Sequence, residues 1–408
     1  MADPIASPQA SYKYTGNLIR GVADEVAFIG AGEVPFLSTI SGTQINLRGG
    51  KTKVFPKLDN LPMTMGNIRG NTFEWYEKDQ VVTTLTSSGN ITNVATTLNI
   101  TPIANAAHIT KGRVIVWGTE HLIADANGDG TTGQVTVKRG HAGTTAVAHT
   151  SAANDLMLLN KANIEGDTVL MDPYVPPTNY FNYWTGSTQS FSKTFYDAAL
   201  ARYGNSKNWK DEAIADALRT IVVGLERAAV YSLRSQGSGT VAGAFGGMNQ
   251  FTSSQTSLSG ATLTTAHVNA PLRAAYDVGG IEGCPDHILT NSSGKLALSK
   301  LFGNNYATIS RQEDDKSAGY VVDMIRTEFG EIKVIMSPYI DSAASELWFF
   351  RKDQISIGPL RNNGVDLSFK AYDLPMTSTA EAGYIYGVYT MCFKRPTSRA
   401  KVSNFVSP

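Results

Sequence analysis

The stretch from Ser206 to Gln236 constrains the fold more than any other part of this 408-residue chain. Its apolar residues recur in steps of three and four, which places them on one stripe of a helix: Ile214, Leu218, Ile221, Val222, Leu225, Ala229 and Leu233. Ser206 can cap the N-terminus, and the glycine-rich run 237–239 ends the helix. At 1.5 Å per residue the pattern predicts a rod of roughly 45 Å. Alone, such a rod is typical of a long core helix in an ordinary domain.

The charge balance and composition exclude several functional classes. Lys and Arg number 35 and so do Asp and Glu, so no net field draws the chain to nucleic acid or an anionic membrane. Charged residues make up only 17%, which favours a surface that packs against copies of itself. The sequence has no apolar run long enough for a membrane helix and no signal-peptide pattern, so we expect no membrane association and residence in a cytosol. Cys284 and Cys392 are expected to be reduced and buried.

Residues 86–164 predict a small all-β domain inserted into a larger one. Strand-like runs recur at regular spacing between Gly and Asn turns, and no helix is expected between them. The spacing indicates a barrel or sandwich of five or six strands.

The segments on either side of this domain, 65–85 and 165–200, are extended and rich in aromatic residues. Aromatic side chains in such segments are either half-buried strand residues or anchors at an interface with another subunit. We predict inter-subunit contacts at five of them: Trp75, Tyr76, Tyr183, Trp184 and Phe191.

The C-terminal half mixes helices and strands without a βαβ rhythm, so the fold class is α+β. We expect helices at 263–278 and 293–302, and strands at 287–290, 319–325, 332–336, 347–350 and 355–359. The segment 384–393 is apolar on both faces, as in a central strand. The tail carries the only basic cluster, formed by Lys394, Arg395, Arg399 and Lys401, which indicates either a solvated tail or contact with enclosed DNA.

The residues that could carry chemistry do not form a recognisable site. The run from Asp125 to Gly130 opens like a calcium-binding loop, but Thr136 stands where the bidentate Glu should be, so a hairpin turn is favoured. The six histidines lack metal-ligand spacing, and His141 and His149 are expected on the surface of one hairpin. No nucleophile or phosphate-loop motif occurs. We therefore predict no catalytic residues, no metal, no cofactor and no enzymatic activity.

In combination, several stretches resemble the major capsid proteins of tailed bacteriophages, whose fold is shared with encapsulins and the herpesvirus capsid floor. Near the N-terminus, GAGEVPFLSTI is similar to the family's Pro-Phe-Leu-Ser turn, here Pro35 to Ser38. NTFEWYEKDQ resembles the strand that enters the extended loop around Trp75. The long helix, with Glu226, corresponds to the family's spine helix.

Two further stretches match a subgroup that carries an inserted β-barrel. The run VKRGHAGTTAVAHTS (137–151) is close to the signature Arg-Gly-x-Gly-Gly-Thr-x-Ala-x-x-His of that barrel. Ala142 stands where the signature usually has Gly. The run NYFNYWTGSTQSFSKT (179–194) resembles the return strand, with Ser190 in place of the usual Ile.

The resemblance implies a subunit of an icosahedral shell that encloses double-stranded DNA, built from pentamers and hexamers. It implies an N-terminal arm with a short helix (1–64), an extended loop (65–85 and 165–200), and the β-barrel insertion (86–164). A peripheral domain with the spine helix (201–283 and 371–408) and an axial domain (284–370) complete the chain. Implied partners are copies of the chain, with scaffolding, portal and decoration proteins and non-specific contact with packaged DNA. We predict no covalent crosslinks, with assembly in the host cytoplasm.

Two other functions stay open from the residues alone. A phage tail or cell-surface adhesion protein would fit the β domain and the Thr and Gly content, but a helix of about 30 residues argues against it. An enzyme with an unrecognised site is disfavoured because ionisable residues do not cluster in the sequence.

Overall fold

A computed structural model describes the residues 34–42, 58–61, 72–78, 82–162, 177–196, 209–303, 310–311, 323–341, 345–362, 365–375 and 379–408. The predicted arm helix within 17–29 lies outside these ranges. The chain forms two compact units: residues 76–179, called the barrel unit below, and residues 1–75 with 180–408, called the core unit. Strands β1 (Thr72–Glu77) and β8 (Thr178–Tyr183), which pair with each other, carry the chain out of one unit and back.

The barrel unit contains a closed six-stranded barrel in the order β2-β3-β6-β5-β4-β7. Its strands are β2 (Thr84–Ser87), β3 (Thr97–Thr101), β4 (Arg113–Trp117), β5 (Glu120–Ala124), β6 (Gln134–Lys138) and β7 (Leu156–Lys161). Alternate residues point inward, so Leu98 and Ile100 of β3 meet Val135 and Val137 of β6 in one core. The predicted inserted β-barrel is confirmed.

The expectation that no helix lies between these strands was wrong. A 3₁₀ helix, Ile103–His108, follows β3 and buries Ala106. Pro102 precedes it and has no N–H to continue the strand ladder, so the chain leaves the sheet at that point.

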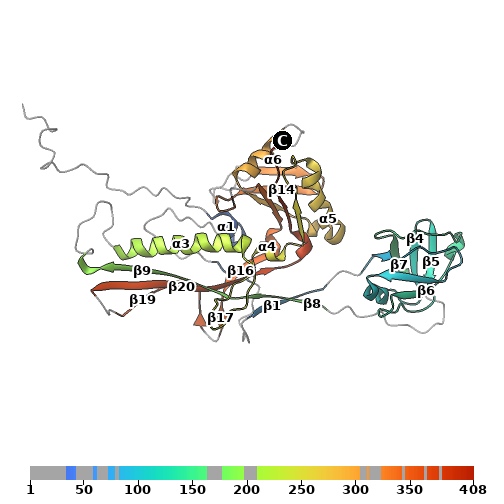
Figure 1. The fold of residues 1–408 in the computed structure, drawn as a ribbon, viewed down its shortest axis with the longest axis horizontal. Helices are drawn as coiled ribbons and strands as arrows, with labels where there is room; N and C mark the ends of the chain where they lie inside the picture. Colours follow the sequence, from blue (N-terminus) through green and yellow to red (C-terminus); the bar gives the residue numbers. More distant parts are fainter. Residues whose placement is uncertain are drawn as a thin grey trace, which may run out of the picture. The chain divides into compact units, whose positions relative to one another are not determined.

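In the core unit, helix α3 (Trp209–Tyr231) packs along β9 (Thr185–Thr194) of a four-stranded sheet, as Figure 1 shows. Strand β20 (Ala380–Phe393) is central in this sheet. It pairs with β9 on one edge and with β16 (Ile355–Pro359) and β19 (Lys370–Asp373) on the other. The prediction that this apolar strand lies centrally is therefore confirmed.

The predicted apolar stripe of α3 faces the core, with Val222, Leu225 and Ala229 almost fully buried. The helix is shorter than predicted, however, because it ends at Tyr231 instead of Gln236. Leu233 lies beyond the end and is 60% exposed. The next residue, Arg234, lies over the Phe181 ring and donates to the Phe181 carbonyl, which draws the chain away from the helix axis.

The second sheet of the core unit has seven strands in the order β10-β21-β15-β11-β14-β13-β12. These are β10 (Ser254–Ser257), β11 (His287–Thr290), β12 (Ser310–Arg311), β13 (Asp323–Thr327), β14 (Gly330–Met336), β15 (Glu346–Phe350) and β21 (Ala400–Ser403). Its central strands are buried on both faces, so neighbouring residues enter different cores. Leu289 packs in the core that contains α3, whereas Ile288 packs with α5 (Thr265–Gly283) and α6 (Ser292–Gly303).

The basic C-terminal segment is part of this sheet, so the predicted solvated or DNA-contacting tail is wrong for two of its four residues. Arg399 is buried and donates to the carbonyls of Phe251 and Lys394. Lys401 lies in β21 and pairs with Glu346 at 2.7 Å. Only Lys394 and Arg395 are exposed.

Candidate assembly site

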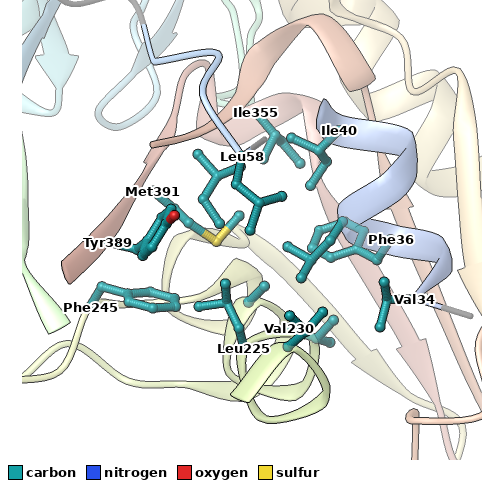
Figure 2. Packing of buried hydrophobic residues seen from close by; sticks show 14 of the residues in the cluster. Val34, Phe36, Ile40, Leu58, Leu225, Val230, Phe245, Ile355, Tyr389 and Met391 are labelled. Atoms are coloured by element: carbon teal, nitrogen blue, oxygen red, sulfur yellow. The ribbon is translucent and has the colours of Figure 1, made fainter. Parts of the chain in front are cut away.

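The short helix α1 (Pro35–Ser41), which follows the predicted N-terminal arm, packs into the main core of the core unit. Pro35 begins the helix, where a missing N–H costs nothing. Figure 2 shows Phe36 and Ile40 pointing toward Leu225 of α3 and Ile355 of β16. The Pro35–Ser38 stretch, which the sequence identified as the family's turn, therefore anchors this segment in the core.

Glu226 of α3 receives the N-terminus of α1. The Phe36 N–H donates to Oε1 at 2.9 Å and the Leu37 N–H donates to Oε2 at 2.8 Å. The hydroxyl of Ser337, just after β14, also donates to Oε1 at 3.3 Å. One carboxylate therefore joins three separate segments of the chain and satisfies two helix N–H groups that have no partner within α1.

The environment of Glu226 is almost completely dry, with 1% of the residue exposed. Burial raises its pKa from 4.5 to about 7, because the charged form loses more from desolvation than it gains from the three hydrogen bonds. Among the described residues, no charged side chain contributes to this shift. Glu226 therefore holds the N-terminus of α1, but its own negative charge is buried without a cationic partner among the described residues.

A second polar network closes the C-terminal end of α3. Glu346 pairs with Lys401 and accepts hydrogen bonds from the Tyr231 hydroxyl at 2.6 Å and from Trp348 Nε1 at 3.0 Å. The Tyr231 oxygen in turn accepts from the N–H of Asp341 at 3.0 Å. Burial and the hydrogen bond to Glu346 raise the pKa of Tyr231. This network ties α3 to β15 and β21.

Aromatic rings gather where β1 and β8 meet the core unit. Trp75 stacks on Tyr180 with ring centroids 6.1 Å apart and contacts Phe251 at 5.7 Å. Phe73 lies between Trp75 and Trp184, at 6.1 and 6.2 Å. These contacts pack β1 and β8 against α4 (Met248–Phe251).

The five predicted inter-subunit contact residues therefore divide into two groups. Trp75, Trp184 and Phe191 are buried and packed within their own chain. Tyr76 is 65% exposed, and Tyr183 is partly buried with its ring against Phe181. Contact with a neighbouring subunit stays a prediction for all five residues.

In the barrel unit, Glu120 organises the loop that carries the barrel signature. Arg139 donates to both of its oxygens, from Nε at 2.7 Å and from Nη2 at 2.6 Å. His149 Nε2 lies 3.0 Å from Oε2, and the N–H groups of Gly140 and Val147 also donate to the carboxylate at 3.1 Å. The Arg, the first Gly and the His of the signature thus converge on one buried acid.

The Glu120 carboxylate has a low pKa although it is fully buried. Burial would raise the pKa, but the hydrogen bonds from Arg139, Val147, His149 and Gly140 outweigh it and lower the value to about 2. His149 stacks on Trp117 at 4.6 Å, and only 10% of its side chain is exposed. The expectation that His149 lies on the hairpin surface was wrong, because Glu120 holds it inside.

The calcium-like loop uses its oxygens within the chain. The Asp129 carboxylate accepts from the Thr131 N–H and the Thr132 hydroxyl, both at 2.8 Å. Asn127 Oδ1 accepts from the Lys111 N–H, and Asp125 pairs with Lys138. These contacts are those of a turn. Within the described ranges, no cluster of three or more His, Cys, Asp or Glu could hold a metal ion.

Two of the residues that organise the structure, Glu226 and Glu120, were not singled out as site residues from the sequence. Glu226 carried a usable signal, because it stands four residues after Val222 and three before Ala229, on the apolar stripe of its own helix. Glu120 follows a Gly-Thr turn and has no comparable local signal.

The described part of the chain has no helix long and apolar enough to cross a bilayer. Cys284 and Cys392 are buried and neither is in a disulfide, as predicted.

Comparisons with known proteins place these features in a family. A family model for the SU10 major capsid protein matches residues 8–405. A structure from Gordonia phage Cozz is similar at 11% identity and a TM-score of 0.46, over 100% of this chain and 99% of that chain. A structure from Mycobacterium phage Bobi is similar at 10% identity and a TM-score of 0.43, over 94% of this chain and 95% of that chain. The SrpI encapsulin complex from Synechococcus elongatus PCC 7942 is similar at 9% identity and a TM-score of 0.41, over 57% of this chain and 76% of that chain.

No curated protein sequence matches the chain significantly. The family model, by contrast, matches residues of both units. The chain therefore belongs to the SU10 major capsid protein family.

Proposed function

We propose that this major capsid protein assembles as pentamers and hexamers into a closed icosahedral shell around the double-stranded DNA genome of a tailed phage. The observation that carries the proposal is the family match over residues 8–405. The balanced charge, 35 basic against 35 acidic residues, supports it, because many copies can then pack without accumulating net repulsion.

The parts of the chain take different roles in this proposal. The arm (1–64) and the extended loop (65–85 and 165–200) reach neighbouring subunits, and the barrel (86–164) faces outward. The peripheral and axial domains form the shell floor. Because α5 shares a hydrophobic core with α6 and the seven-stranded sheet, we place α5 and β21 with the axial part instead of the peripheral part.

The remaining partners are proposed from the family alone. Scaffolding, portal and decoration proteins contact the shell, assembly takes place in the host cytoplasm, and packaged DNA makes non-specific contacts. Lys394 and Arg395 are the residues of the basic cluster that are exposed, and we propose that they make such contacts. We expect no catalytic activity.

Expression of the full chain, alone and with its scaffolding partner, tests the proposal. Negative-stain microscopy should show closed shells with five-fold and six-fold rings of subunits. Chains that stay monomeric in both conditions and bind a sugar would instead support the adhesion protein.

A further inference from the structure

Helix α5 presents an apolar face away from the core that it covers. Val268, Leu272 and Ala275 are buried against the seven-stranded sheet, as expected for a surface helix. The outward positions normally carry charged or polar residues. Here Val278 is 58% exposed, and Ile281, which follows the kink at Gly280, is 72% exposed.

Beside this face lies a hollow of about 440 Å³ between α5 and the turn that joins β13 to β14. Ala266, Ala270 and Ala274 form its floor at steps of four residues. Glu328 and Phe329 of the turn form its wall. The small side chains leave room for an inserted side chain from outside.

The acidic side of the hollow is available for pairing. Glu328 is exposed and makes no ion pair within the described residues. Asp277 lies 3.8 Å from Arg273, beyond hydrogen-bonding distance, and both side chains are largely exposed. The hollow therefore carries one more negative than positive charge.

Helix α6, on the same hydrophobic core, has the complementary features. Leu296 is 62% exposed in the middle of the helix. Lys295 stands beside it and Lys300 one turn later, and the helix sequence SSGKLALSKLFG contains no acidic residue. Lys300 is exposed and forms no ion pair among the described residues.

We propose that Leu296 of one copy inserts into the alanine hollow of the next copy, with Lys300 facing Glu328. A second copy is the occupant because one chain carries both surfaces. On α6, exposed Leu296 lies near Lys300, and on α5 the alanine-lined hollow lies beside Glu328. The two patches differ, so the contact is head-to-tail and repeats around a ring instead of closing a dimer. The inference rests on the proposed function and names the surface through which subunits meet.

A charge exchange between Lys300 and Glu328 tests this contact. Lys300→Glu and Glu328→Lys each place like charges opposite one another, and each should lower subunit association about tenfold, measured by sedimentation of the full chain. The chain with both changes should return to within about twofold of wild type. Ala270→Trp, which fills the hollow from an exposed position, should lower association in a chain that keeps its fold.

Arg227→Glu is the matched control, because it makes the same charge change at an exposed position of α3, outside both patches. It should assemble like wild type, and a cooperative thermal transition should show that every variant is folded. Normal assembly of the single variants, or failure of the double variant to recover, would overturn the contact while wild-type shells still uphold the proposed function. A wild-type chain that never assembles would overturn both.

Discussion

Glu226 of the core unit and Glu120 of the barrel unit are both buried, and their carboxylates behave in opposite ways. The described donors to Glu226 are two backbone N–H groups and a hydroxyl, all of them neutral, and its pKa rises to about 7. Glu120 accepts from Arg139 and its pKa falls to about 2. Burial raises the pKa of both carboxylates, so the difference comes from their hydrogen-bond partners. A guanidinium offsets the desolvation of a carboxylate, whereas backbone N–H groups and a hydroxyl do so only in part.

The difference has a structural consequence. The barrel loop is held by a compensated charge that stays ionised at physiological pH. Helix α1 is held by an acid whose protonation state changes near neutral pH. The contact that fixes the start of the described chain should therefore respond to pH, and the barrel should not.

Removing the compensating charge from the barrel should produce the largest effect. Arg139→Leu leaves Glu120 buried without its cationic partner and should destabilise the barrel unit by about 3–5 kcal/mol. Hydrogen exchange of barrel peptides in the full chain measures the loss. Lys138→Leu is the matched control, because the Lys138 side chain is 69% exposed and its ion pair should contribute less than about 1 kcal/mol. Equal losses in the two variants would mean that the Glu120 pair does not hold the barrel together.

The pH dependence of the core unit should follow Glu226. Its pKa is higher in the folded than in the unfolded chain, so folding takes up a proton between pH 4.5 and about 7. The stabilisation is full below pH 4.5 and is lost as the pH rises through 7, by about 3 kcal/mol in all. Urea unfolding of the core unit between pH 5 and 8 measures it. Glu120 acts in the opposite direction and at lower pH, because its stabilisation is lost as the pH falls from 4.5 toward 2.

Glu226→Gln provides the control for this dependence. The amide has the same shape and does not titrate, so the stability change between pH 5 and 8 should flatten. If the slope persists in Glu226→Gln, another group is responsible.

A smaller effect is expected at Ser337, the third donor to Glu226. Ser337→Ala removes a hydrogen bond to the carboxylate and should destabilise the core unit by about 1 kcal/mol. Because the hydroxyl favours the charged form, the loss should be greater at pH 8 than at pH 5. Urea unfolding at the two pH values tests this, and an equal loss at both would show that the hydroxyl does not act on the charge.

The smallest effect is expected at the departure from the barrel signature. Ala142 has a φ of +57°, a left-handed conformation that favours glycine. Ala142→Gly should stabilise the barrel by up to about 1 kcal/mol. Ala148→Gly, in the same loop but at an ordinary φ, should destabilise it slightly. Hydrogen exchange of the barrel strands distinguishes the two variants. A loss of protection in Ala142→Gly would show that the backbone at Ala142 is not strained.

Structural features that depend on residues close together in the sequence could be predicted from the sequence alone. The stripe of α3 and the alternation in β3 and β6 are periodic signals, and each was found because side-chain direction follows from backbone geometry. The two-faced apolar strand β20 was placed centrally for the same reason. The limits of α3 were less certain, because Leu233 continues the period while Arg234 and Phe181 draw the chain away.

The sequence by itself thus determined the long helix α3, the central strand β20, the separate β-barrel and the family. Only the tertiary structure decided which polar residues are buried and what compensates them. Glu226 meets residues 36 and 37 across about 190 positions, and the buried Arg399 meets Phe251 across 148. Such pairings depend on how distant segments pack, and the free energy of a buried charge depends on those partners more than on its own neighbours in sequence.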